Sequence, residues 1–244
     1  ILGNLLQQFY NVADTLSVGQ FLGSTALAAV GSSYTLMTFL TSILLGMCMG
    51  SGAVFSIRFG EGDLPRLKNS LSLSFLLIGG FTVALNVAVF LLIDPMMALL
   101  QVPADVIPLM RSYLWVIFWG IGGTFLYNYF ASLLRAVGNS ATPLVFLGVS
   151  AVLNIVLDLV FVVAVPWGVA GAAFATSFSQ WVSGVGLLVY TWKRMAHLRP
   201  SRQDVYWKRD RVGEIARFSL LTCVQQSVMN FGILMVQGLV NSFG

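Results

Sequence analysis

The sequence predicts an all-α, polytopic bundle of transmembrane helices. Hydrophobic residues make up 57% of its 244 residues and charged residues only 9%, whereas roughly 25% of residues in an ordinary soluble domain are charged. The mean hydropathy of +0.86 means that apolar side chains cover most of the surface as well as the core, and lipid is the solvent that tolerates such a surface. The chain begins at Ile1 and stops at Gly244 inside an apolar run, so we expect a piece of a longer protein.

Several apolar runs reach the length of about 20 residues with which a helix crosses a bilayer. Helix is the backbone expected in each run, because an unpaired backbone polar group in lipid costs several kcal/mol. Glycine or proline near several of the ends is typical of helix boundaries. The predicted spans are 1–21, 26–57, 70–93, 106–134, 142–165, 168–192 and 213–243.

Basic residues are concentrated in alternate loops, at 58–69, 135–141 and 193–212, and the loops between them carry no Lys or Arg. The positive-inside rule therefore places these three loops and the N-terminus in the cytoplasm, in a multi-pass protein of the cell's inner (plasma) membrane. Arg111, at the outer end of the fourth span, is an exception. Because topology accounts for the net charge of +4, we expect no nucleic-acid binding.

Two of the nine acidic residues, Asp14 and Asp158, lie inside predicted spans. A charged side chain there costs at least about 2.5–3.5 kcal/mol, which favours a functional role. With a rise of 1.5 Å per residue, Asp14, Asp158 and Thr176 all lie roughly 9–12 Å below the outer surface and can converge. Asn154 precedes Asp158 by one helical turn. The predicted cation-coupling site is Asp14, Asn154, Asp158 and Thr176.

Three more polar residues repeat along the same helical faces and are expected to support this site: Gln7, Asn11 and Gln180. Two buried carboxylates close together do not both ionise comfortably, so the pair can carry a proton. The same oxygens also suit a small cation such as sodium. A third interpretation is a polar cluster that only joins helices. We expect no other metal and no cofactor.

Aromatic side chains crowd the fourth predicted span. They form either an interfacial belt with a lipid-facing surface or one wall of a cavity for flat, often cationic drugs. The candidates for such a wall are Trp115, Trp119 and Tyr127. In the second span, the spacing of Gly46 and Gly50 predicts a close helix–helix contact.

Five segments resemble multidrug and toxic compound extrusion (MATE) transporters. Residues 7–15 (Gln-Gln-Phe-Tyr-Asn-Val-Ala-Asp-Thr) and 26–31 (Ala-Leu-Ala-Ala-Val-Gly) resemble the opening of these proteins. Residues 134–143, 154–158 and 167–176 continue the resemblance in the same order, so it covers essentially the whole chain.

The resemblance implies two six-helix lobes that alternate between inward- and outward-open states and expel drugs or toxins in exchange for protons or sodium. It implies a first lobe at 1–192, a cytoplasmic inter-lobe linker at 193–212 and the first helix of the second lobe at 213–244. We expect a monomer in the lipid bilayer that is not an enzyme. In members with a cation site in the first lobe, the residues matching the four predicted here form it. Other members carry an acidic residue on the seventh helix, where this chain has Gln225 and Gln226.

Two alternatives remain from the sequence. A lipid-linked-precursor flippase of the same broad superfamily is expected to line its cavity with arginine for phosphate, and no arginine lies deep inside a predicted span. An intramembrane aspartyl protease using Asp14 and Asp158 is the more remote alternative. Its acidic pair is expected in a glycine-flanked motif, whereas Asp158 lies between Leu157 and Leu159.

Overall fold

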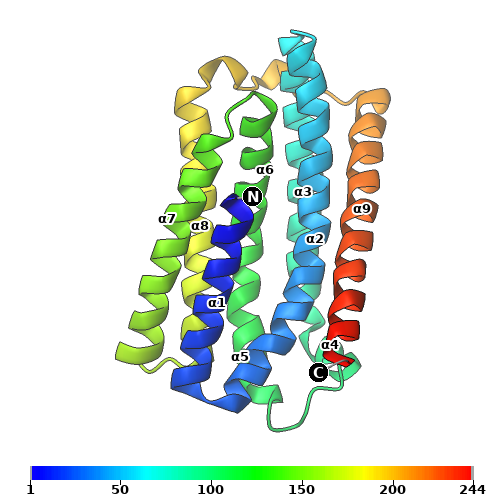
Figure 1. The fold of residues 1–244 in the computed structure, drawn as a ribbon. Helices are drawn as coiled ribbons and strands as arrows, with labels where there is room; N and C mark the ends of the chain where they lie inside the picture. The colour runs from blue at the N-terminus through cyan, green and yellow to red at the C-terminus, as the bar shows by residue number, and fades with distance from the viewer. Residues whose placement is uncertain (1, 243–244) are drawn as a thin grey trace.

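The computed structural model describes residues 2–242, in which no β-strand occurs, and shows an elongated bundle of helices (Figure 1). This confirms the predicted all-α class. The α-helices are α1 (Leu2–Leu22), α2 (Ser24–Gly60), α3 (Leu64–Leu91), α4 (Ile93–Leu99), α5 (Ile107–Ile117), α6 (Ile121–Ala136), α7 (Ala141–Asp158), α8 (Val169–Arg194) and α9 (Arg209–Ser242). The shorter elements are the 3₁₀-helices η1 (Phe118–Gly120), η3 (Ala196–Leu198) and η4 (Arg202–Asp204) and the π-helix η2 (Leu159–Ala164).

Within the described residues, five helical stretches are long and apolar enough to cross a membrane. They are α2, α3, α5 with η1 and α6, α7 with η2, and α8. These match the second to sixth predicted spans. The first predicted span, 1–21, overlaps α1, and the seventh, 213–243, overlaps α9. Residues 1 and 243–244 lie outside the described part of the chain.

Three boundaries differ from the prediction. Helix α3 begins at Leu64 rather than 70, because the Asp63 side chain accepts a hydrogen bond from the Arg66 backbone N–H and caps the helix. The predicted loop at 94–105 contains most of α4, and α9 begins within the predicted linker, at Arg209. In α3 and α9 charged residues extend the helix beyond the apolar run, whereas α4 is a short and largely apolar helix.

The loops gather at the two ends of the bundle (Figure 1). The α2–α3 and α6–α7 turns and the α8–α9 linker lie at one end, and the α1–α2, α4–α5 and α7–α8 connections lie at the other. All three basic loops therefore share one end, which we call the basic end.

The linker is anchored to the basic end by polar contacts. The Asn69 side-chain amide of α3 donates to the backbone carbonyls of Asp204 (2.8 Å) and Tyr206 (3.0 Å). Arg58 of α2 forms an ion pair with Glu214 of α9 at 2.6 Å. These contacts fix the start of α9 against α2 and α3.

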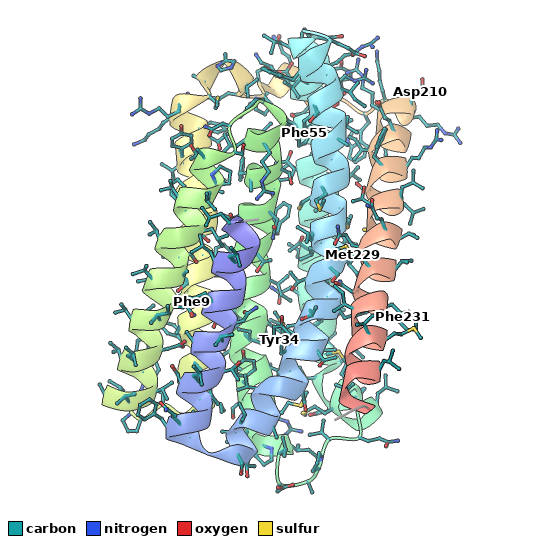
Figure 2. The ribbon with its side chains drawn as sticks, in the orientation of Figure 1. Phe9, Tyr34, Phe55, Asp210, Met229 and Phe231 are labelled. Atoms are coloured by element: carbon teal, nitrogen blue, oxygen red, sulfur yellow. The ribbon has the colours of Figure 1, made fainter. Side chains whose placement is uncertain are left out.

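Helix α9 packs along α2 (Figure 1). The predicted close contact at Gly46 and Gly50 is confirmed, because a Cβ atom at either position would lie 2.6 Å from backbone atoms of α9. At Gly46 the neighbour is Cys223, and at Gly50 the neighbours are Phe218 and Ser219. The Ser219 hydroxyl and the Cys223 thiol also donate to carbonyls of α2, at 3.3 and 3.2 Å. Met229 and Phe231 of α9, which Figure 2 labels, are exposed.

Gly50→Ala should destabilise the packing of α9 on α2, because the new methyl group would overlap backbone rather than a movable side chain. Overpacking of this kind costs about 1–3 kcal/mol. Gly80→Ala in α3 is the matched control, since nothing lies within 4 Å of its Cβ position. The control should be neutral or slightly stabilising, because Ala is the better helix former. Unfolding temperatures of the two full-length variants test this expectation, and equal temperatures would contradict the close packing.

Candidate functional site

Three helices carry the four predicted cation-site residues, and the structure brings these residues together. Asp14 lies on α1, Asn154 and Asp158 lie one turn apart on α7, and Thr176 lies on α8. Helix α7 packs against both α1 and α8. Asn154 and Asp158 are each only 1% exposed and Thr176 is 5% exposed. The carboxyl groups of Asp14 and Asp158 lie within hydrogen-bonding reach of each other when one is protonated.

Hydrogen bonds fix the position of Thr176 and orient Asn154. The Asn154 amide Nδ2 donates to the Thr176 hydroxyl at 3.1 Å, and this hydroxyl donates to the Ala172 carbonyl at 3.2 Å. The Thr176 hydroxyl thus donates its hydrogen within α8, and the oxygen of the same hydroxyl accepts the hydrogen bond from Asn154. The amide oxygen of Asn154 is left for another partner.

The remaining oxygens of the site are buried acceptors without a hydrogen-bond partner among the described residues. They are Asp14 Oδ1, Asn154 Oδ1 and both carboxyl oxygens of Asp158. A buried polar atom in this condition costs about 1–3 kcal/mol. Carboxylate and amide oxygens are the ligands that hard cations prefer, and a carboxyl pair can also share a proton. This set of oxygen atoms therefore fits a bound proton or a small cation such as sodium.

Tyrosines that the sequence analysis did not assign to the site surround it. Tyr10 and Tyr113 both lie close enough to the two carboxyl groups to interact with them electrostatically. The sequence signal for Tyr10 is its position one helical turn before Asp14. Tyr113 belongs to α5 and has no such signal, because only the packing of α5 in the bundle brings it near.

A π-helix begins directly after Asp158. In η2 the Val165 N–H donates to the carbonyl of Val160, five residues earlier, at 2.7 Å. The sequence predicts an uninterrupted span at 142–165, and Pro166 marks only its end. The wider turn packs against α1 and α8, the helices that complete the site. Turns of this type often occur at functional sites in proteins.

A family model, MatE, matches residues 1–160 of the chain. The chain belongs to the MatE family. The matched region contains α1 to α7 and therefore Asp14, Asn154 and Asp158, while Thr176 lies beyond it.

Relatives and solved structures agree with this assignment. The MatE chain is 32% identical over its whole length to the probable multidrug resistance protein YpnP of Bacillus subtilis, and covers 54% of that protein. It also matches a structure described as the outward-facing conformation of a multidrug resistance MATE family transporter of the MOP superfamily. The TM-score is 0.88 and the sequence identity is 24%. The match covers 96% of this chain and 52% of the other. A structure described as the inward-facing conformation of such a transporter has a TM-score of 0.83 and is 26% identical. That match covers 90% of this chain and 50% of the other. The chain thus spans about half the length of these proteins.

Two of the three predicted supporting residues contact other helices. In the MatE chain, Gln180 accepts a hydrogen bond from the Thr124 hydroxyl at 2.8 Å and so joins α8 to α6. The Asn11 amide donates to the Tyr34 hydroxyl at 3.5 Å and joins α1 to α2, where Figure 2 shows Tyr34. The side chain of Gln7 lies outside those that the structure describes.

The three aromatic side chains predicted as candidates for a cavity wall lie against different neighbours. The rings of Trp115 and Trp119 are exposed and both pack against Phe90 of α3, with ring centroids 4.9 and 5.1 Å away. The Tyr127 hydroxyl instead donates to the Pro143 carbonyl of α7 at 2.9 Å. The two tryptophans thus contact α3, whereas Tyr127 contacts α7.

Asp158→Asn should stabilise the protein, because it removes one of two adjacent buried carboxylates and supplies an amide that can donate to Asp14. We expect a gain of roughly 1–3 kcal/mol at pH 8, the range for satisfying a buried polar group, and a smaller gain at pH 5, where protons already relieve the repulsion. Thermal unfolding of full-length protein measures both values. Asp105→Asn, at an exposed loop position, is the control and should change little. A gain that is absent, or equal at both pH values, would argue against a closely spaced ionisable pair.

Proposed function

We propose that this MatE chain is part of a secondary active transporter that exports organic, often cationic, compounds by alternating access. Export is driven by exchange for a proton or sodium ion that binds at Asp14, Asn154, Asp158 and Thr176. The observation that carries the proposal is the buried carboxyl pair with its unpartnered oxygens. The drug substrate class is supported by the name of the YpnP relative, a probable multidrug resistance protein.

Coupling requires that the cation bind with different affinity in two conformations of the protein. The proposed site is suited to this, because its ligands come from α1, α7 and α8 rather than from one helix. A change in how α1 packs against α7 would separate Asp14 from Asp158 and alter cation affinity. The outward- and inward-facing structures of the matched MATE family transporters support such alternation.

The two alternative functions have less support. A flippase for lipid-linked precursors needs cationic groups for phosphate, and among the described residues the groups facing Asp14 and Asp158 are tyrosines, an amide and a hydroxyl. An aspartyl protease would need the two carboxyl groups to hold a water and a peptide bond. The leucines that flank Asp158 give no glycine-flanked motif for this purpose. We therefore propose a transporter rather than an enzyme.

The proposal predicts that Asp158→Asn, which mimics a permanently protonated carboxyl, abolishes gradient-driven efflux and leaves equilibrium drug binding measurable. Gln226→Ala on α9 is the control, because it removes a buried polar side chain that offers no titratable group. It should retain most of the efflux activity. The measurement is drug efflux from vesicles of full-length protein, with proton and sodium gradients imposed separately. Full efflux by Asp158→Asn would show that this carboxyl does not couple, and the cluster would then serve only to join helices.

A further inference from the structure

An apolar groove with a volume of about 740 Å³ lies at the basic end, between α3, α6, α8 and the linker. Its walls include Leu76 of α3, Phe130 of α6, Val189 of α8 and Val205 of the linker. Leu76, Val189 and Val205 are each at least two-fifths exposed. The groove is therefore open at the side of the bundle, where a membrane-embedded helix faces lipid, and it does not include the residues of the cation site.

Two cations line the same groove where it meets the linker, Lys193 and Arg199. The Arg199 side chain folds back onto α8: its guanidinium lies 5.1 Å from the centre of the Trp192 ring, and its Nε donates to the Trp192 carbonyl. Neither cation forms an ion pair with any carboxylate in the part of the chain that the structure describes. The end of an apolar groove thus carries two positive charges that form no ion pair with the acidic side chains described.

A buried hydroxyl adds a polar atom to the wall. Thr191 lines the groove, is only 7% exposed, and its Oγ1 has no hydrogen-bond partner among the described residues. Threonine hydroxyls in helices commonly donate to a carbonyl one turn earlier, as Thr176 does. The Thr191 hydroxyl is free to donate to a ligand at the junction between the apolar wall and the cations.

The depth of the groove matches the headgroup region of a bilayer. Thr191, Trp192 and Lys193 occupy the last turn of α8, and Trp192 is 56% exposed. Exposed tryptophan and lysine at the end of a span are typical of the membrane–water interface. The apolar part of the groove is then at the level of the acyl chains, and the cations are at the level of phosphate groups.

We propose that this groove binds an anionic glycerophospholipid from the leaflet at the basic end. An acyl chain fills the apolar groove, the phosphate accepts charge-assisted hydrogen bonds from Lys193 and Arg199, and the Thr191 hydroxyl donates to a phosphate or ester oxygen. Basic pockets between transmembrane helices recognise anionic headgroups through this combination of charge and apolar contact. The site is separate from Asp14 and Asp158, and its existence does not depend on the transport activity proposed above.

The test is binding of phosphatidylglycerol and phosphatidylcholine to full-length protein, measured by native mass spectrometry and by exchange of spin-labelled lipid. Lys193→Gln with Arg199→Gln should weaken phosphatidylglycerol binding about thirty-fold, from the usual contribution of two basic side chains at an anionic surface. Phosphatidylcholine binding should change little. Val189→Trp, which fills the apolar wall, should weaken both lipids.

Arg202→Gln with Arg209→Gln is the matched control, because it removes the same charge from the same end of the bundle at residues that do not line the groove. An equal loss of phosphatidylglycerol binding in this control would show a general surface potential and overturn the site. Displacement of the lipid by soluble glycerol phosphate would overturn the role of the acyl chain. Absence of a bound anionic lipid in the unmodified full-length protein would mean that another segment covers the groove, and would also overturn the proposal. Unfolding temperatures confirm that the variants remain folded.

Discussion

Two carboxyl groups lie side by side inside an apolar helix bundle, and the cost of that arrangement constrains the surrounding structure. Asp14 and Asp158 are on helices far apart in sequence, so they remain adjacent only while α1 packs against α7. Their buried oxygens lack partners among the described residues, and like charges at this spacing repel strongly in a low-dielectric interior. A proton or a small cation between them would offset both costs. The stability of the bundle and the occupancy of the site are therefore linked.

A series of helix contacts connects the cation site to α9 on the other side of α2. Helix α1 packs against α7 and α2, and α2 in turn packs against α9 through Gly46 and Gly50. The Asn11–Tyr34 hydrogen bond joins α1 to α2 at the level of the site. A change in cation occupancy that shifted α1 would thus displace α2. Because α2 and α9 are in close contact at Gly46 and Gly50, a displacement of α2 would also move α9. Coupling requires an element with two discrete arrangements, and α1, which carries Asp14 and packs on both α7 and α2, is the helix best placed to be that element.

Much of the fold could be predicted from the sequence, because lipid enforces two simple rules. Apolar length predicts each span, and the alternation of basic loops predicts which connections share an end. The meeting of Asp14, Asp158 and Thr176 followed from the same rules, since helical rise and alternating direction assign each residue a depth.

The parts that were not predicted depend on lateral packing, which depth does not determine. Tyr113 joins the site because α5 packs beside it, and Gln180 turns to Thr124 although its spacing matches Thr176. Trp115 and Trp119 share a span with Tyr127 but contact α3 rather than α7, and position along one span does not determine that neighbour. The π-turn after Asp158 also has no clear signal, because Pro166 predicts only the end of the helix.

The central claim, that the carboxyl pair binds a cation in competition with an exported compound, is tested most directly by counting cations at equilibrium. The measurement is the number of protons or sodium ions released when drug binds to purified full-length protein, followed with a pH indicator in weakly buffered solution and with a sodium-sensitive electrode. The account predicts release of about one cation per drug molecule bound, and loss of that release in Asp158→Asn while drug still binds. Drug binding that releases neither ion, or release that persists unchanged in Asp158→Asn, would contradict it.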